Sequence, residues 1–288
     1  MGNKRKMTRR SFLKRSALTL LGMAVAGGTY TRFIEPGWIE WKRMIHYSSR
    51  LPEAFHNLRI IHFSDLHFGY HMNAERLLSI VEQMNEERAD LIFFTGDLID
   101  NGLAKVDQVI PVLKKLHAPL GKFAVLGNHD FRHAPESKST NALEQAGFRV
   151  LKNQHVDLVR SGAKIAVAGL EDWFGGFPNV REAVKGIKAD RYTLLLAHEP
   201  DLADEAMKYA IDLQLSGHSH GGQVRIPGVP VKWNPEMGQK YPDGLYTFPN
   251  TEFKVYTNRG LGMTFLPVRF LCRPEITVHT LRRQVTQP

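Results

Sequence analysis

Five short strings of polar residues stand where predicted strands end, and their side chains are of the kinds that bind transition metals. They supply carboxylates, an amide and imidazoles, the oxygen and nitrogen ligands that suit Mn, Fe or Zn. A single string of this kind is common in turns and is weak evidence for a site. Five in order, each after a strand, indicate a shared site at the carboxyl edge of a sheet, where ligands gather. The strings are Asp65-Leu66-His67, Gly96-Asp97-Leu98-Ile99-Asp100, Gly127-Asn128-His129-Asp130, Ala197-His198-Glu199 and Gly217-His218-Ser219-His220.

The spacing within the strings favours a common cluster. Asp65 and His67 are two residues apart, as are His218 and His220, so in an extended strand end each pair points to one side. Glycines before three of the candidate ligands permit sharp turns where the backbone leaves its strand. These three ligands are Asp97, Asn128 and His218.

The elements that must position these strings alternate between strands and helices, which predicts an α/β fold. We expect strands at 38–44 (an edge strand), 58–63, 91–95, 123–126, 164–169, 193–197, 213–216, 245–248, 254–257 and 276–281. We expect helices at 74–89, 106–116, 141–146, 180–187 and 201–209. After Gly221 the chain becomes irregular, with prolines at 227, 230, 235 and 242.

The net charge of +9 is concentrated near the start of the chain. Residues 1–26 contain seven basic residues and no acidic one, and removing these seven from the net charge leaves +2 for the rest. A specific nucleic-acid partner is therefore not expected. Cys272 is the single cysteine of the 288 residues, so the chain cannot form an internal disulfide and a metal site must use other ligands.

The N-terminal segment predicts export. Thr8-Arg9-Arg10-Ser11-Phe12-Leu13-Lys14 resembles a twin-arginine signal, and the apolar run from Ser16 to Tyr30 contains the cleavage pattern Ala24-Val25-Ala26. The run is about 22 Å long as a helix, short for a membrane core of about 30 Å. We expect a signal peptide at 1–26, an N-terminal extension with an edge strand at 27–57, and a catalytic domain at 58–288. We expect the twin-arginine machinery to export the protein to the periplasm, the outer face of the membrane or the cell wall.

The five strings resemble, in order and spacing, the signature of the calcineurin-like metallophosphoesterases from Leu58 to Gly222, and Arg273–Ile276 resembles the tail of an exported bacterial branch. The resemblance implies a four-layer αββα sandwich. It also implies two divalent transition-metal ions, Mn, Fe or Zn. Asp65, His67 and His220 would hold one ion, Asn128, His198 and His218 the other, and Asp97 would bridge them.

A two-metal site of this kind is expected to hydrolyse a phosphate ester, most readily a diester. Two such ions about 3.5 Å apart make hydroxide from a shared water at neutral pH, and that hydroxide attacks phosphorus in line. His129 is the predicted proton donor to the leaving group, oriented by Asp130, although it could instead bind phosphate as a cation. Asp100 is expected to orient a ligand.

Other readings remain open from the sequence. Envelope polymers, phospholipid-like diesters and nucleotides are candidate substrates. A pyrophosphatase acting on a nucleotide-diphospho-lipid, such as a UDP-diacylated sugar, is the main alternative. Gly217–Gly221 also matches the G-x-S-x-G elbow of serine hydrolases, with Ser219, Asp243 and His279 in the required order. A binding module without catalysis is the remaining class.

Overall fold

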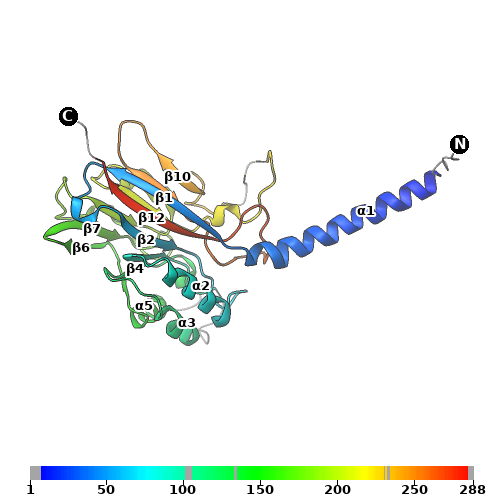
Figure 1. The fold of residues 1–288 in the computed structure, drawn as a ribbon, viewed down its shortest axis with the longest axis horizontal. Helices are drawn as coiled ribbons and strands as arrows, with labels where there is room; N and C mark the ends of the chain where they lie inside the picture. The colour runs from blue at the N-terminus through cyan, green and yellow to red at the C-terminus, as the bar shows by residue number, and fades with distance from the viewer. Residues whose placement is uncertain (1–7, 101–105, 133–134, 230, 232–233, 285–288) are drawn as a thin grey trace.

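Two six-stranded sheets form the body of the protein (Figure 1). The computed structural model describes residues 8–100, 106–132, 135–229, 231 and 234–284. The first seven residues of the predicted leader, and Pro230 of the irregular loop, lie outside these ranges.

The first sheet contains most of the N-terminal strands, in the order β1-β12-β2-β3-β4-β5. β2 to β5 run parallel, β12 is antiparallel to β2, and β1 is a parallel edge partner of β12. The strands are β1 (Glu40–Ser48), β2 (Leu58–Phe63), β3 (Leu91–Thr95), β4 (Lys122–Val125), β5 (Phe148–Val150) and β12 (Glu275–Arg283).

The second sheet has the order β10-β11-β9-β8-β7-β6. Its four central strands are parallel, and each edge strand is antiparallel to its neighbour. The strands are β6 (Gln154–Arg160), β7 (Ala163–Gly169), β8 (Thr193–Leu196), β9 (Leu213–Ser216), β10 (Gly244–Thr247) and β11 (Lys254–Thr257).

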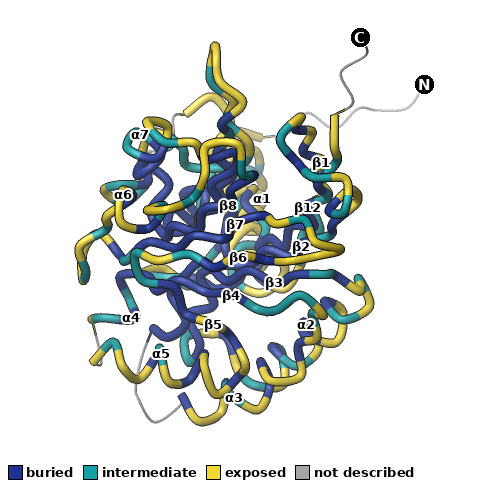
Figure 2. Tube along the Cα trace, turned by 90° about the vertical axis from the view of Figure 1, so that its left-hand side faces the viewer, coloured by how far each residue is buried: buried dark blue, intermediate teal, exposed yellow. Residues whose placement is uncertain are grey.

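The two sheets face one another across an apolar core to which Ile60, Phe93, Val167 and Leu194 belong. Helices α2 (Ala74–Glu86), α3 (Val106–Leu113) and α5 (Glu136–Gln145) pack on the outer face of the first sheet. The short helices α6 (Val180–Ala183) and α7 (Ala203–Ala206) cover the second sheet. Figure 2 shows the buried strands between exposed helical surfaces. The predicted α/β fold, a four-layer αββα sandwich, is confirmed.

Helix α2 shows how the pattern of the sequence produces these layers. The Asn73 side chain accepts a hydrogen bond from Arg76 N at 2.9 Å and so caps the first turn. Leu77, Ile80, Val81 and Met84 then recur at helical spacing and are buried on the sheet.

Helix α1 (Arg9–Thr29) contains most of the predicted leader and projects from the body (Figure 1). None of its residues is buried. Among the helices that the structure describes, none is both long and apolar enough to cross a bilayer. A π-helical turn (Tyr30–Ile34) and a 3-10 turn (Glu35–Gly37) join α1 to the edge strand β1.

The structure adds elements that the sequence prediction lacked. β5 has only three residues, and β6 buries only Val156 and Leu158 on one face. A two-residue turn at Ser161-Gly162, both with positive φ, joins β6 to β7 as a hairpin. Helix α5 begins five residues before the predicted 141, in a polar stretch without apolar periodicity.

Candidate metal centre

The seven predicted metal ligands meet at one edge of the sandwich, in the loops that follow β2, β3, β4, β8 and β9. All seven are buried. The two sheets therefore contribute to one site, because their parallel strands end on the same side.

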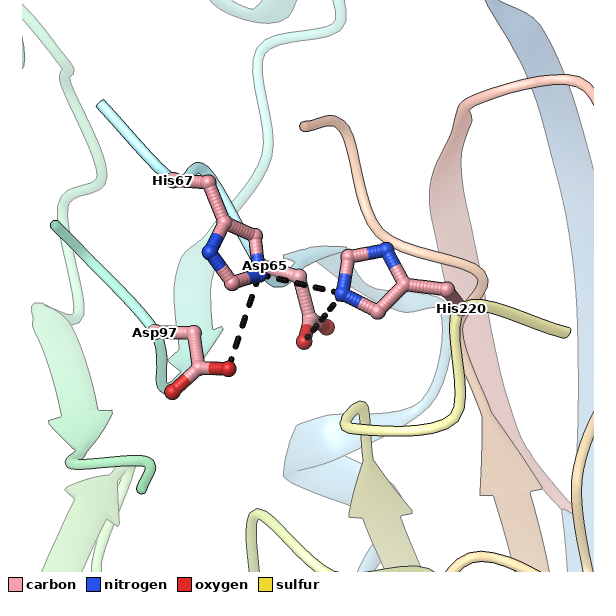
Figure 3. A group of neighbouring side chains, drawn as sticks. All are labelled: Asp65, His67, Asp97 and His220. Carbon is pink, nitrogen blue, oxygen red and sulfur yellow. Dashed lines mark hydrogen bonds and ion pairs between the residues drawn. The ribbon is translucent and has the colours of Figure 1, made fainter. Parts of the chain in front are cut away.

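One set of donors comprises Asp65, His67, Asp97 and His220, whose ligand atoms all lie within 4.8 Å of one another (Figure 3). His67 Nε2 is 3.0 Å from His220 Nε2, and His220 Nε2 is 3.4 Å from Asp65 Oδ1. Two carboxylates and two imidazoles thus converge on one point.

A second set lies beside the first. His198 Nε2 is 3.3 Å from Asn128 Oδ1 and 3.2 Å from His218 Nδ1. Asp97 connects the two sets, because its Oδ2 atom is 3.5 Å from His67 Nε2 and 3.4 Å from His198 Nε2. One carboxylate oxygen faces both groups of imidazoles.

Hydrogen bonds outside the cluster fix which nitrogen of two histidines faces it. His198 Nδ1 is 2.6 Å from the Thr95 carbonyl oxygen, and His218 Nε2 is 2.9 Å from that of Glu236. A carbonyl only accepts, so these nitrogens carry the protons and the opposite nitrogens present lone pairs to the cluster.

The backbone at these strand ends is not extended. The prediction that Asp65 and His67, and His218 and His220, lie in extended strand ends is therefore wrong. Asp65, His67, His218 and His220 all have positive φ, between 44° and 68°, and Asp97 has φ 59°. Asp65 and His67, like His218 and His220, reach one cluster because their backbone is in the left-handed region. They do not reach it because side chains two residues apart in an extended strand point to the same side. Such conformations are costly outside glycine and gather at functional sites.

The glycines of the strings serve two purposes. Gly96 has φ 97° and makes the predicted turn. Gly127 and Gly217 do not have positive φ among the described glycines, so the turn explanation is wrong for them. A Cβ at Gly127 would overlap Asp97 and His198, and one at Gly217 would overlap Ser64 and Asp65. These two glycines leave room for the ligand side chains.

His129 and Asp130 occupy different surroundings, and the prediction that Asp130 orients His129 is wrong. Asp130 accepts hydrogen bonds from the N–H groups of Gly127, Asp97 and Leu98, at 3.0 to 3.1 Å, and so braces two of the strand-end loops. Both residues lie in a short helix (His129–Arg132), where adjacent side chains diverge.

Asp100 takes the place predicted for Asp130. Its Oδ1 lies 2.7 Å from His129 Nδ1 and 3.5 Å from His67 Nδ1. The His129 ring stands edge-on to that of His67, with centroids 4.6 Å apart. Asp100 therefore holds both rings, which matches its expected orienting role.

The electrostatics suit metal binding. Burial, with the His198 ring beside it, lowers the pKa of His218 to about 3, and burial with His67 lowers the pKa of His220 well below its usual range. Imidazoles with lowered pKa stay neutral, the form that binds metals. Burial, with the Asp97 carboxylate nearby, raises the pKa of Asp65, and a bound cation would relieve that repulsion.

Two groups near the centre were not predicted. Arg269 is fully buried and donates to the carbonyl oxygens of Cys272, Arg259 and Gly262 at 2.7 to 3.0 Å. Glu199, beside His198, is also fully buried, and burial with the neighbouring Asp172 raises its pKa well above the ordinary value. These two residues could not be predicted because their burial distinguishes them, and the sequence does not show that an arginine or a glutamate beside a loop is buried.

The serine-hydrolase alternative is wrong. Ser219 Oγ donates to the Pro242 carbonyl, and Asp243 forms an ion pair with Arg225 at 2.8 Å. His279 lies in β12, where its Nδ1 is 2.8 Å from His46 Nε2. The three residues of the supposed triad each have other partners.

Comparisons with known proteins agree with this geometry. Residues 58–222 match the family model of the calcineurin-like phosphoesterases. The chain is 39% identical over 284 residues to metallophosphoesterase YkuE of Bacillus subtilis, covering 96% of this chain and 99% of the relative. It is 31% identical over 276 residues to phosphodiesterase YaeI of Escherichia coli, covering 94% and 98%.

Proposed function

Because the chain belongs to the calcineurin-like phosphoesterase family, we propose that it is a phosphodiesterase that acts outside the cytoplasm. It is a metal-dependent phosphoester hydrolase, and its candidate metal site is built from the residues described above. The relative named a phosphodiesterase supports the preference for diesters.

The observation that carries the proposal is the position of Asp97 between two sets of buried ligand side chains. Asp65, His67 and His220 would hold one divalent ion, and Asn128, His198 and His218 the other, with Asp97 shared. When bound, the two ions activate water and neutralise charge on the phosphoryl oxygens. The protein's own task is to hold these donors in one buried arrangement, which the backbone contacts of Asp130 and the carbonyls of Thr95 and Glu236 accomplish.

His129 is proposed to donate a proton to the leaving group. Its Nδ1 faces Asp100, so the other ring nitrogen is directed away from that carboxylate. The side chain is 11% exposed, which leaves an edge of the ring open to a substrate. Export through the twin-arginine pathway is proposed from the leader sequence around Arg9 and Arg10.

Replacing the shared carboxylate tests the proposed centre. Asp97→Asn should reduce the metal content and lower kcat/KM on a nitrophenyl phosphodiester by more than about 100-fold, since changes even to partners of metal ligands cost 10–100-fold. The measurements are elemental analysis of the purified chain and initial rates. Asp107→Asn, on the exposed side of α3, is the control and should change neither. A metal-free chain that still hydrolyses the diester would contradict the proposal.

A substrate panel would separate the diesterase from its main alternative. The panel should contain a diester, a monoester and a nucleotide-diphospho-lipid. The diester should be the most rapidly hydrolysed. Faster release of a nucleoside monophosphate from the diphospho-lipid would favour the pyrophosphatase.

A further inference from the structure

Six large apolar side chains are exposed on segments that meet at one end of the sandwich. We call them the apolar rim. Phe265 is 90% exposed and Phe33 is 70% exposed, and each of the others is at least half exposed. Apolar groups in such number on one face mark an interaction surface rather than scattered exposure. The rim comprises Phe33, Ile34, Ile226, Phe265, Leu266 and Leu271.

Hydrogen bonds donated by backbone N–H groups join the three rim segments. Arg269 N donates to the Thr31 carbonyl at 3.0 Å, and Leu271 N donates to Glu35 Oε2 at 3.0 Å. Phe270 N donates to the Gln223 carbonyl at 3.0 Å. The three segments that contain the rim, residues 30–37, 223–229 and 264–271, are therefore held next to one another.

The rim lies beside the candidate metal centre. Gln223 follows His220 by three residues, and its side-chain amide donates to the carbonyls of Thr264 and Leu266. Tyr70 follows His67 by three residues, and its hydroxyl donates to the Phe265 carbonyl at 3.1 Å. The most exposed part of the rim is thus attached to the chain directly after two predicted metal ligands.

The loop that carries Phe265 is braced from inside. The buried Arg269 side chain donates to carbonyls on both sides of it, at Gly262 and Cys272. The exposure of Phe265 and Leu266 therefore belongs to a held conformation, which keeps their side chains turned toward solvent.

The charge of the rim segments suits an anionic surface. They contain one carboxylate, Glu35, and three arginines. Arg269 is fully buried and Arg225 forms an ion pair with Asp243, so Arg32 is the cation that these segments present. Glu35 is fully buried, because it accepts the N–H groups of Leu271 and Cys272. Arg32 lies over the Phe33 ring, 5.0 Å from its centroid, so a cation and an apolar group are presented together. This is the composition of surfaces that bind anionic lipid interfaces.

Helix α1 leaves the body from the same end (Figure 1). Its side chains are exposed, and they include Leu18, Leu20, Leu21 and Val25, with Arg9, Arg10, Lys14 and Arg15 toward its start. The turn that follows it contains Phe33 and Ile34. The basic and apolar leader is thus joined directly to the rim segment that contains Phe33 and Ile34.

We propose that the apolar rim docks on a lipid bilayer that contains anionic lipids, with Phe265 and Leu266 entering the interface. The metal centre would then lie close to the bilayer surface, because Tyr70 and Gln223 connect it to the rim. If the proposed phosphodiesterase activity holds, its substrate class is a phosphate ester carried by a lipid. The docking itself does not depend on that activity.

A fluorescent label at the rim tests the docking in the full chain. Cys272 is fully buried, so a cysteine introduced by Phe265→Cys can be labelled selectively with a polarity-sensitive dye. Mixing with vesicles of phosphatidylcholine and phosphatidylglycerol should shift its emission to shorter wavelength and protect it from iodide. The control is Val159→Cys on β6, which is 56% exposed and outside the rim, and its label should stay accessible. Pure phosphatidylcholine vesicles should bind more weakly.

If α1 alone attaches the chain to vesicles, iodide will still quench the label at position 265. That result would overturn the proposal. The same result is expected if the rim binds a protein instead. Phe265→Ser combined with Leu266→Ser should weaken vesicle binding by about 10-fold or more, because each buried apolar side chain changes an affinity by about that factor. Val159→Ser should leave binding unchanged.

Two variants separate this proposal from the proposed activity. Asp97→Asn should lose hydrolysis and still dock. The Phe265 and Leu266 double variant should hydrolyse a soluble nitrophenyl diester normally and lose rate on a phosphodiester embedded in vesicles. A wild-type chain that docks without hydrolysing either diester would refute the activity and leave the docking intact.

Discussion

At the scale of single residues, the centre depends on how protons and lone pairs are assigned to its histidines. Thr95 and Glu236 supply carbonyls that fix the protonated nitrogen of His198 and His218. His129 differs, because its Nδ1 faces the Asp100 carboxylate rather than a carbonyl. A carboxylate partner stabilises the protonated ring, as a proton donor requires.

The role of His129 is tested by the leaving group of the substrate. His129→Ala should retain both metals and slow an alkyl phosphodiester by about 10²–10⁴-fold, the usual contribution of general acid catalysis. The nitrophenolate of a nitrophenyl diester leaves without protonation, so the hydrolysis of that substrate should slow much less. The measurements are kcat/KM on both substrates and the metal content.

Equal losses on the two substrates would instead show that His129 binds the phosphoryl group. A lower metal content would place it among the ligands. Asp100→Asn is the companion variant and should show a weaker form of the same dependence on leaving group.

The sequence was sufficient to predict which residues gather at the centre but not their conformations. Asp, Asn, His and Gly after apolar strands are visible in the chain, and the resemblance to the family singled out seven of these residues as predicted ligands. The left-handed backbone at Asp65 or His218 depends on contacts with distant loops, such as the hydrogen bond from His218 N to the Asp65 carboxylate at 3.2 Å. The same holds for Asp130, two of whose three partners, Asp97 and Leu98, lie at the end of β3, while Gly127 lies at its own strand end.

At the scale of elements, strands with strong apolar patterns were predicted and weaker ones were not. β3 and β9 are buried throughout and were predicted with their observed bounds. β6 is an edge strand with one buried face, and its residues Gln154, Val159 and Arg160 break the alternation of apolar and polar residues. Pairing with β7 stabilises β6, and this pairing cannot be read from the residues of β6 alone.

Strands β1, β12 and β2 enclose three histidines between the sheets. His46 Nε2 is 2.8 Å from His279 Nδ1, and the His279 ring lies 5.6 Å from that of His62. Burial, with Lys254 nearby, lowers the pKa of His46 to about 3. Burial lowers the pKa of His62 to about 3 against the opposing effect of Glu275.

This cluster predicts acid sensitivity. A folded-state pKa below the unfolded value of about 6.5 means that the unfolded chain binds the proton first as pH falls. The free energy of unfolding should therefore decrease as pH falls from about 6.5, by up to about 1.4 kcal/mol per pH unit for each such group. Urea denaturation at pH 7.5 and pH 5 should show a smaller pH effect for His62→Met than for the wild type.

The exposed His117 provides the control, and His117→Asn should retain the wild-type pH effect. Histidines of the metal centre are common to all three chains, so they cancel in this comparison. An equal pH effect in His62→Met and the wild type would mean that His62 is not a source of it.

At the scale of the whole molecule, the leader and the body are separate in structure. Helix α1 buries no residue, and the body begins to pack at Glu35 and Pro36. A leader that takes no part in the core remains open to a receptor while the body is folded, as export of a folded protein requires.

Export is tested by replacing Arg9 and Arg10 with Lys, which keeps the charge and removes the paired arginines that the receptor reads. The double variant should accumulate in the cytoplasm, and fractionation followed by immunoblotting would measure this. Replacing Lys14 and Arg15 by Arg and Lys is the control and should leave export normal. Normal export of the Arg9 and Arg10 variant would indicate the general secretory route.

The position of β12 has a consequence for the order of events during synthesis. This last strand lies between β1 and β2, which are among the first strands to be made. Until residues 275–283 leave the ribosome, β1 lacks the strand that it pairs with in the described part of the chain, and β2 has an open edge. The first sheet therefore forms fully only after β12 has been made. A chain truncated before β12 exposes an unpaired strand edge, the feature by which aggregation begins.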